Sequence, residues 1–223
     1  MGPAIGDTLP LALGIAISPI PIIAAILMLL SPKARSTSVG FLLGWVLGIV
    51  VVVVVFTLLS ALIPASEPGE SKPIAGVIKL VLGVLLLLLA LRQWRGRPKG
   101  DTQPTLPKWM SAIDSMTAVR GLLLGFLLAA LNPKNLLLGI SAGVVIGADD
   151  LSVGSSAIVI VVFTLIASST IGIPVIAFLV ASERMRHPLD ELRNWLVQNN
   201  ATVMSLLLLV LGVVVISKGV ASF

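Results

Sequence analysis

Asn132-Pro133-Lys134-Asn135 interrupts an otherwise apolar run over residues 121–147. A run of this length can cross a bilayer, because a spanning helix needs about 20 apolar residues. Proline cannot continue an unbroken helix, and it pushes the residue before it towards extended geometry. A lysine at the bilayer centre costs about 2.5–3.5 kcal/mol on insertion scales. The stretch therefore predicts a broken membrane helix that uses its polar residues. The alternative is a proline kink whose lysine snorkels to an interface.

Composition predicts that most of the chain lies in a membrane. Of the 223 residues, 57% are hydrophobic and 11% are charged, whereas a soluble domain carries about 25% charged residues. Mean hydropathy is +1.11. We therefore predict a single integral membrane domain over residues 1–223. The chain has no cysteine, which excludes disulfide chemistry and cysteine-ligated metals. The net charge of +5 does not indicate nucleic-acid binding, because the basic residues fall in links between apolar segments.

Six apolar segments are long enough to span a bilayer: about 9–31, 39–63, 74–93, 120–147, 153–181 and 201–222. The sequence thus predicts an all-α membrane protein with six transmembrane helices. Two short helices are expected in the headgroup layer, at residues 107–119 and 188–197, because each places apolar residues on one helical face. A stripe of glycines in the second segment, Gly40, Gly44 and Gly48, lets another helix approach closely.

Basic residues predict the orientation of the chain. The links after the first, third and fifth segments carry eleven of them: Lys33, Arg35; Arg92, Arg95, Arg97, Lys99, Lys108, Arg120; and Arg184, Arg186, Arg193. The opposite side carries at most three, which are Lys72, Lys79 and Lys218. The positive-inside rule puts the basic links in the cytoplasm and both termini outside. We expect a multi-pass protein of the cell membrane.

An internal repeat is visible in the order of the segments. Three pairs match: residues 53–58 with 160–165, residues 81–84 with 210–213, and Ser18-Pro19 with Asn132-Pro133. A rival alignment sets Ser31-Pro32-Lys33 against Asn132-Pro133-Lys134, but it places the end of a span opposite the centre of one. The first alignment predicts two inverted three-helix repeats, about 9–93 and 120–222, with broken helices 1 and 4. A basic cytoplasmic linker, about 94–119, joins them.

The polar residues at the two breaks form the candidate site. We predict substrate binding by Lys134, Asn132, Asn135 and Ser18, with the helix breaks made by Pro19, Pro21 and Pro133. A broken helix offers backbone donors without partners and the positive end of its dipole, so a neighbouring lysine predicts an anion site for carboxylate, sulfate or phosphate. The sequence has no deep Asp or Glu and no nucleophile–base pair. It predicts no metal site, no cofactor and no enzymatic activity.

A family resemblance rests on the order Trp109, Ile113-Asp114, Gly121, Gly125 and Asn132-Pro133-Lys134-Asn135-Leu136, together with Ser18-Pro19-Ile20-Pro21 and Ser31-Pro32-Lys33-Ala34. These motifs resemble the GAP family of actinobacteria, the glycolipid- or sulfolipid-addressing proteins, within the lysine-exporter superfamily. The resemblance covers nearly the whole chain. Ile20 stands where the amino-acid exporters of that superfamily have glycine. The resemblance therefore implies export of a cell-envelope lipid or its precursor rather than of an amino acid.

Three functions are compatible with these patterns. The leading hypothesis is a membrane transporter that exports an amphiphilic, anionic envelope lipid or lipid precursor. The alternatives are an exporter of a small solute such as an amino acid, and a non-transporting membrane scaffold for lipid export. The expected partners are the lipid substrate and membrane lipids, with a homodimer or the envelope-lipid export machinery as protein partners and no nucleic acid.

Overall fold

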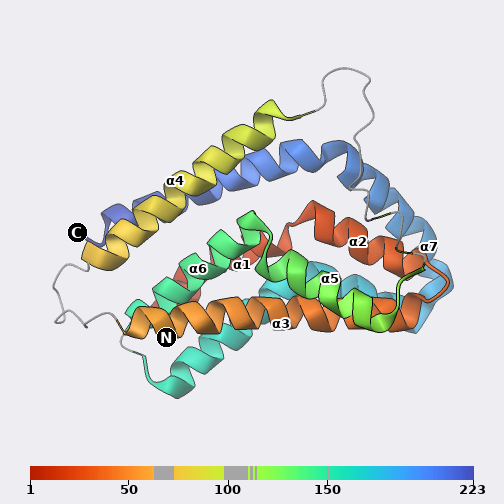
Figure 1. Cartoon of the computed structure of the whole chain (residues 1–223), viewed down its shortest axis with the longest axis horizontal. Helices are drawn as coiled ribbons and strands as arrows, with labels where there is room; N and C mark the ends of the chain where they lie inside the picture. Colours follow the sequence, from red (N-terminus) through yellow and green to blue (C-terminus); the bar gives the residue numbers. More distant parts are fainter. Residues whose placement is uncertain (63–72, 98–109, 111–112, 114, 150) are drawn as a thin grey trace.

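The computed structural model describes residues 1–62, 73–97, 110, 113, 115–149 and 151–223. Within these ranges the chain forms helices and no strands (Figure 1). They are α1 (Gly2–Ala16), α2 (Pro19–Leu30), α3 (Ala34–Ala61), α4 (Pro73–Arg95), α5 (Ala118–Ala130), α6 (Pro133–Ala148) and α7 (Val153–Val220). The predicted all-α class is confirmed. Six residues of the predicted helix at 107–119 lie outside the described residues, and its last two belong to the start of α5.

Both predicted helix breaks occur at their prolines. Helices α1 and α2 form one apolar pair bent by 53°, and α5 and α6 form a second pair bent by 65°. In each pair the second helix starts on a proline, Pro19 or Pro133, which has no backbone N–H to continue the preceding helix. Each break lies near the middle of its pair, as the sequence predicted.

The described residues contain three helices that are long and apolar enough to span, or up to five spans if each bent pair counts as one. The difference from the six predicted segments comes from α7, whose 68 residues include two of those segments and are broken only by a kink. A straight helix of that size would be about 100 Å long, more than three times the hydrocarbon thickness. Its backbone leaves helical geometry at Ala181, with φ −140° and ψ 56°. The expected link between residues 181 and 201 is therefore helical.

The path of α7 explains how one helix contacts most of the others. In Figure 1 its first part lies behind α3, and it bends at the end of the molecule far from the termini before returning beside α4. Residues 188–197 are helical as predicted, and Leu189 and Leu196 of this stretch are buried. Both chain termini lie at the same end of the molecule (Figure 1).

Glycines set the close packing of α3 against α5. A β carbon at Gly44 would collide with the carbonyl oxygen of Leu122, and one at Gly125 would collide with the carbonyl oxygen of Phe41. The two helices therefore touch backbone to backbone, as small residues permit in membrane helices. The glycine stripe of α3 is confirmed as a packing surface, and it fixes α5 as one arm of the second break.

The same kind of contact joins α4 to the last part of α7. A β carbon added at Gly83 would lie 3.0 Å from the carbonyl oxygen of Gly212, and one added at Gly212 would lie 3.2 Å from that of Gly83. The two glycines therefore face each other. In Figure 1 this pair of helices forms a separate layer beside α1 and α6.

Candidate functional site

The carboxyl end of α1 needs partners, because the last carbonyls of a helix have no intrahelical donors. Here the following segment supplies several of them. The Ile17 amide donates to the Leu13 oxygen at 2.9 Å, and the Ser18 amide donates to the Ala16 oxygen at 2.9 Å. The Ser18 hydroxyl lies 2.6 Å from the Ile15 oxygen. The carbonyls of Gly14 and Ile17 remain for donors from elsewhere in the chain.

Lys134 supplies those donors from α6. Its Nζ donates to the Gly14 oxygen at 2.6 Å, to the Ile17 oxygen at 3.0 Å and to the Ser18 hydroxyl at 2.6 Å. An ammonium has three donors, so this geometry uses all of them. A cation is also favoured at this end of a helix, where the macrodipole is negative. The side chain is 2% exposed and points into the protein, so the snorkelling alternative is wrong.

Asn132 caps the first turn of α6. Its Oδ1 accepts from the Lys134 amide at 3.1 Å, and its carbonyl oxygen accepts from the Leu136 amide at 2.8 Å. Pro133 has no amide proton to offer. The second break therefore exposes fewer backbone donors than the sequence suggested. Asn132 is joined to Lys134 through the backbone and not through the ammonium.

Asn135 ties the two breaks together. Its Oδ1 lies 3.1 Å from the Ser18 hydroxyl, and its Nδ2 donates to the Leu128 oxygen of α5 at 3.0 Å. The side chain is almost fully buried at 1% exposure. The four predicted residues thus lie in one hydrogen-bonded group, here called the break cluster: Ser18, Asn132, Lys134 and Asn135.

The prolines of the first break have a different effect. Pro19 and Pro21 are buried in the first turn of α2, and neither can donate a backbone hydrogen bond. Ser18, at the N-cap position, makes no side-chain bond to that turn. The first break therefore presents mainly carbonyl oxygens, while the second presents an ammonium and two amides.

Two contributions to this site were not found from the sequence. The backbone carbonyls of Gly14 and Ile17 carry no sequence signal, because any residue type supplies the same oxygen. Thr170 of α7 donates to the Ala16 oxygen at 2.6 Å, which brings a third element to the first break. The run of hydroxyls at residues 168–170 was the signal for it, but such groups more often bond within their own helix, as Ser169 does to Ile166.

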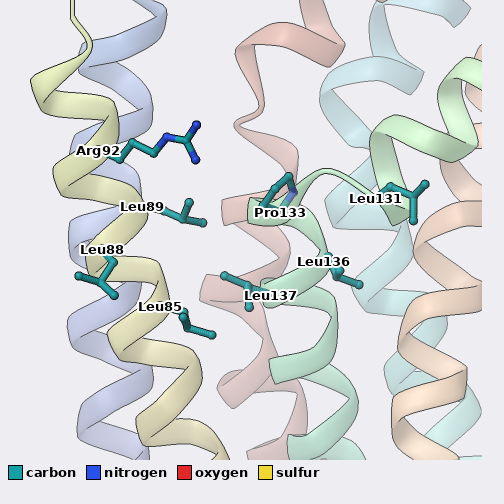
Figure 2. Close-up of a pocket in the computed structure, with 8 residues that line it drawn as sticks. All are labelled: Leu85, Leu88, Leu89, Arg92, Leu131, Pro133, Leu136 and Leu137. Carbon is teal, nitrogen blue, oxygen red and sulfur yellow. The ribbon is translucent and has the colours of Figure 1, made fainter.

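A groove opens between α4 and α6 beside the second break (Figure 2). Its volume is about 440 Å³, and it is lined by Leu85, Leu88, Leu89, Arg92, Leu131, Pro133, Leu136 and Leu137. Figure 2 shows the Arg92 side chain extending from α4 towards α6 at one end of the groove, with leucines along the rest. The spacing of residues 85, 88, 89 and 92 places them on one helical face, but α4 is apolar on its other faces too, so this spacing did not indicate the groove.

One protein family matches nearly the whole chain. Residues 8–221 match the family described as Sap, sulfolipid-1-addressing protein, and the chain belongs to that family. This agrees with the family predicted from the sequence motifs. No curated protein and no solved structure matches the chain.

Proposed function

We propose that this protein is a membrane transporter that exports an anionic amphiphile, a cell-envelope lipid or its precursor. The family description names a sulfolipid, whose acidic headgroup fits a site built around a lysine. One observation carries the proposal: Lys134 crosses from one broken helix to the open carbonyl end of the other. A buried cation that bridges two interrupted helices is placed where transporters hold their substrates.

The hydrogen bonds from Lys134 to the first break, here called the bridge, suggest how an anionic headgroup drives the transport step. In this structure the ammonium has three neutral oxygen partners, Gly14 O, Ile17 O and the Ser18 hydroxyl. The bonds from the ammonium to these neutral oxygens are already charge-assisted, and an anionic partner adds the direct attraction between opposite charges. A sulfate or phosphate group can therefore take Lys134 from the first break and free α1–α2 to move against α5–α6. A neutral headgroup offers no such exchange.

The architecture that we propose is a single domain of six spans in two inverted repeats. This requires α7 to supply the fifth and sixth spans, on either side of Ala181, where its backbone leaves helical geometry. Two observations support it. The matched segments 81–84 and 210–213 meet at Gly83 and Gly212, as residues beside a two-fold axis would. Ser31, in the rival alignment, lies at the turn between α2 and α3 and not at a bend within a pair.

We further propose that both termini face outwards and that the basic ends of the helices lie in the cytoplasm. Arg97 stacks on the indole of Trp94, 3.5 Å from its ring centroid, at the basic end of α4. Tryptophan and arginine at a span end are typical of the membrane–water interface. The lipid would then be taken from the cytoplasmic leaflet and released outwards, either to a second copy of the chain or to the export machinery of the envelope.

The test is flux of labelled lipids in liposomes that contain the purified protein. Acyl-labelled sulfated glycolipid, phosphatidylglycerol and phosphatidylcholine are compared, with and without an imposed proton gradient. We expect the two anionic lipids to move and phosphatidylcholine to stay. Flux of labelled amino acids without lipid flux would instead identify a small-solute exporter. Loss of an envelope lipid from a deletion strain, combined with no flux by the purified protein, would identify a scaffold.

A further inference from the structure

We propose that the groove between α4 and α6 is the lateral entry site for the lipid, with its acidic headgroup at Arg92 and one acyl chain along the leucines. This inference rests on the proposed function, because it names the route by which the transported lipid reaches the break cluster. It specifies where the lipid binds, which part of the lipid is bound and from which leaflet the lipid enters.

The chemistry along the groove matches a lipid in a membrane. Arg92 lies two residues before Trp94, whose stacking with Arg97 marks the interface level of α4. Below it come Leu89, Leu88 and Leu85, so the lining changes from cationic to apolar as it enters the bilayer. The seven steps along the helix from Leu85 to Arg92 rise about 10 Å, roughly a third of the hydrocarbon thickness. The groove therefore fits the headgroup and the upper part of one chain.

Charge favours an anionic headgroup over a neutral one at this position. The guanidinium of Arg92 can bind a phosphate or sulfate in a bidentate manner. Figure 2 shows it extending towards Pro133, the first residue of α6, and the dipole of this 16-residue helix is positive at that end. Both features act on the same end of the groove. The volume of about 440 Å³ lies within the range of about 300–1,000 Å³ found for ligand pockets.

The groove and the bridge lie on opposite sides of one helical turn. Pro133 is exposed and lines the groove, whereas the side chain of the next residue, Lys134, is buried and directed to α1. A headgroup held at Arg92 is therefore beside the turn that carries the bridging ammonium. Arg92 would act first, on the exposed side of this turn, and Lys134 second, on its buried side.

The test measures binding rather than transport. Purified protein in nanodiscs is irradiated with lipids that carry a photoreactive group in the upper part of the acyl chain, and the labelled peptides are identified. Phosphatidylglycerol should label the peptides of α4 and α6 that line the groove, more than phosphatidylcholine does. Arg92→Gln should lower labelling by phosphatidylglycerol about fivefold, since one basic residue near the surface contributes that much to anionic lipid binding. Labelling by phosphatidylcholine should not change.

Two further variants complete the design. Arg95→Gln removes an exposed arginine from the same helix that does not line the groove, and it should leave labelling within twofold of the original. Leu85→Trp fills the apolar end and should reduce labelling by both lipids. Equal losses in Arg92→Gln and Arg95→Gln would overturn the site. Because no flux is measured, failure here leaves the proposed transport to be judged by the liposome assay.

Discussion

The two helix breaks share a proline but differ in the hydrogen-bonding groups that they present. Each places a proline at the start of its second helix, yet the residue before that proline behaves in opposite ways. Asn132 caps α6, whereas Ser18 leaves α2 uncapped and turns its hydroxyl back to α1 and across to Asn135. The first break supplies acceptors and the second supplies donors. The two interruptions are thus complementary, and the contact between them depends on that difference.

Removal of the central donor should have the largest effect on this arrangement. Lys134→Met leaves the Gly14 and Ile17 carbonyls without their bridging partner, and each buried group left unsatisfied costs about 1–3 kcal/mol. We expect lipid flux to fall more than tenfold and the thermal unfolding midpoint in detergent to drop. Lys33→Met, which removes an exposed lysine, is the matched control and should alter neither. Unchanged flux and stability in Lys134→Met would show that the bridge is dispensable.

The next largest effect is expected when the packing of α5, the first helix of the second break, against α3 is disturbed. Gly44→Ala adds a methyl group where the carbonyl of Leu122 already lies, so α5 must move away from α3. Such overpacking costs about 1–3 kcal/mol. We expect a lower unfolding midpoint and weaker flux, because the Leu128 carbonyl that holds Asn135 moves with α5. Gly172→Ala is the control, since its added carbon would meet a single side-chain atom at 3.8 Å, an ordinary contact. If both substitutions are tolerated equally, α5 is not held by the glycine stripe.

Substitutions of Ser18 and Asn132 test the difference between the two breaks directly. Ser18→Ala removes an acceptor of Lys134, and Asn132→Ala removes a helix cap, and each should cost about 1 kcal/mol. In double-mutant cycles with Lys134→Met, Ser18→Ala should show coupling of about 0.5–3 kcal/mol, as residues in contact do. Asn132→Ala should add independently, because its bond is to the backbone amide. The reverse pattern of coupling would mean that the breaks do not differ as described.

The smallest effect on function is expected from single cysteines that report the orientation of the chain in the membrane. The chain has no native cysteine, and Ser36, Ser152 and Gln198 are exposed. Each variant should transport normally. We expect impermeant maleimide to label the cysteine at Ser152 in intact cells and to reach those at Ser36 and Gln198 only after permeabilisation. Labelling of Ser36 from outside would reverse the proposed direction of transport.

The positions of both breaks could be predicted because their cause is local. Proline lacks an amide proton and restricts the residue before it, which favours a break at Pro19 and at Pro133. The preference is not absolute, because Pro10 lies inside α1 and Pro174 and Pro188 lie inside α7. The position of Lys134 near the middle of the α5–α6 pair followed from counting apolar residues on either side. The family followed from the order of motifs along the chain and is confirmed over residues 8–221. The helical link within α7 was predicted only in part, since residues 188–197 appeared as a separate short helix.

What the sequence by itself determined is where the chain is apolar, where its helices break and which polar residues lie at those breaks. The tertiary structure decided what these residues contact. In helices that are apolar on nearly every side, periodicity does not indicate which face meets a neighbour, so neither the α4–α6 groove nor the position of Arg92 could be derived. The oxygens of Gly14 and Ile17 belong to backbone common to all residues, and they meet Lys134 across more than 100 positions. Only the packing of α6 against α1 could select them.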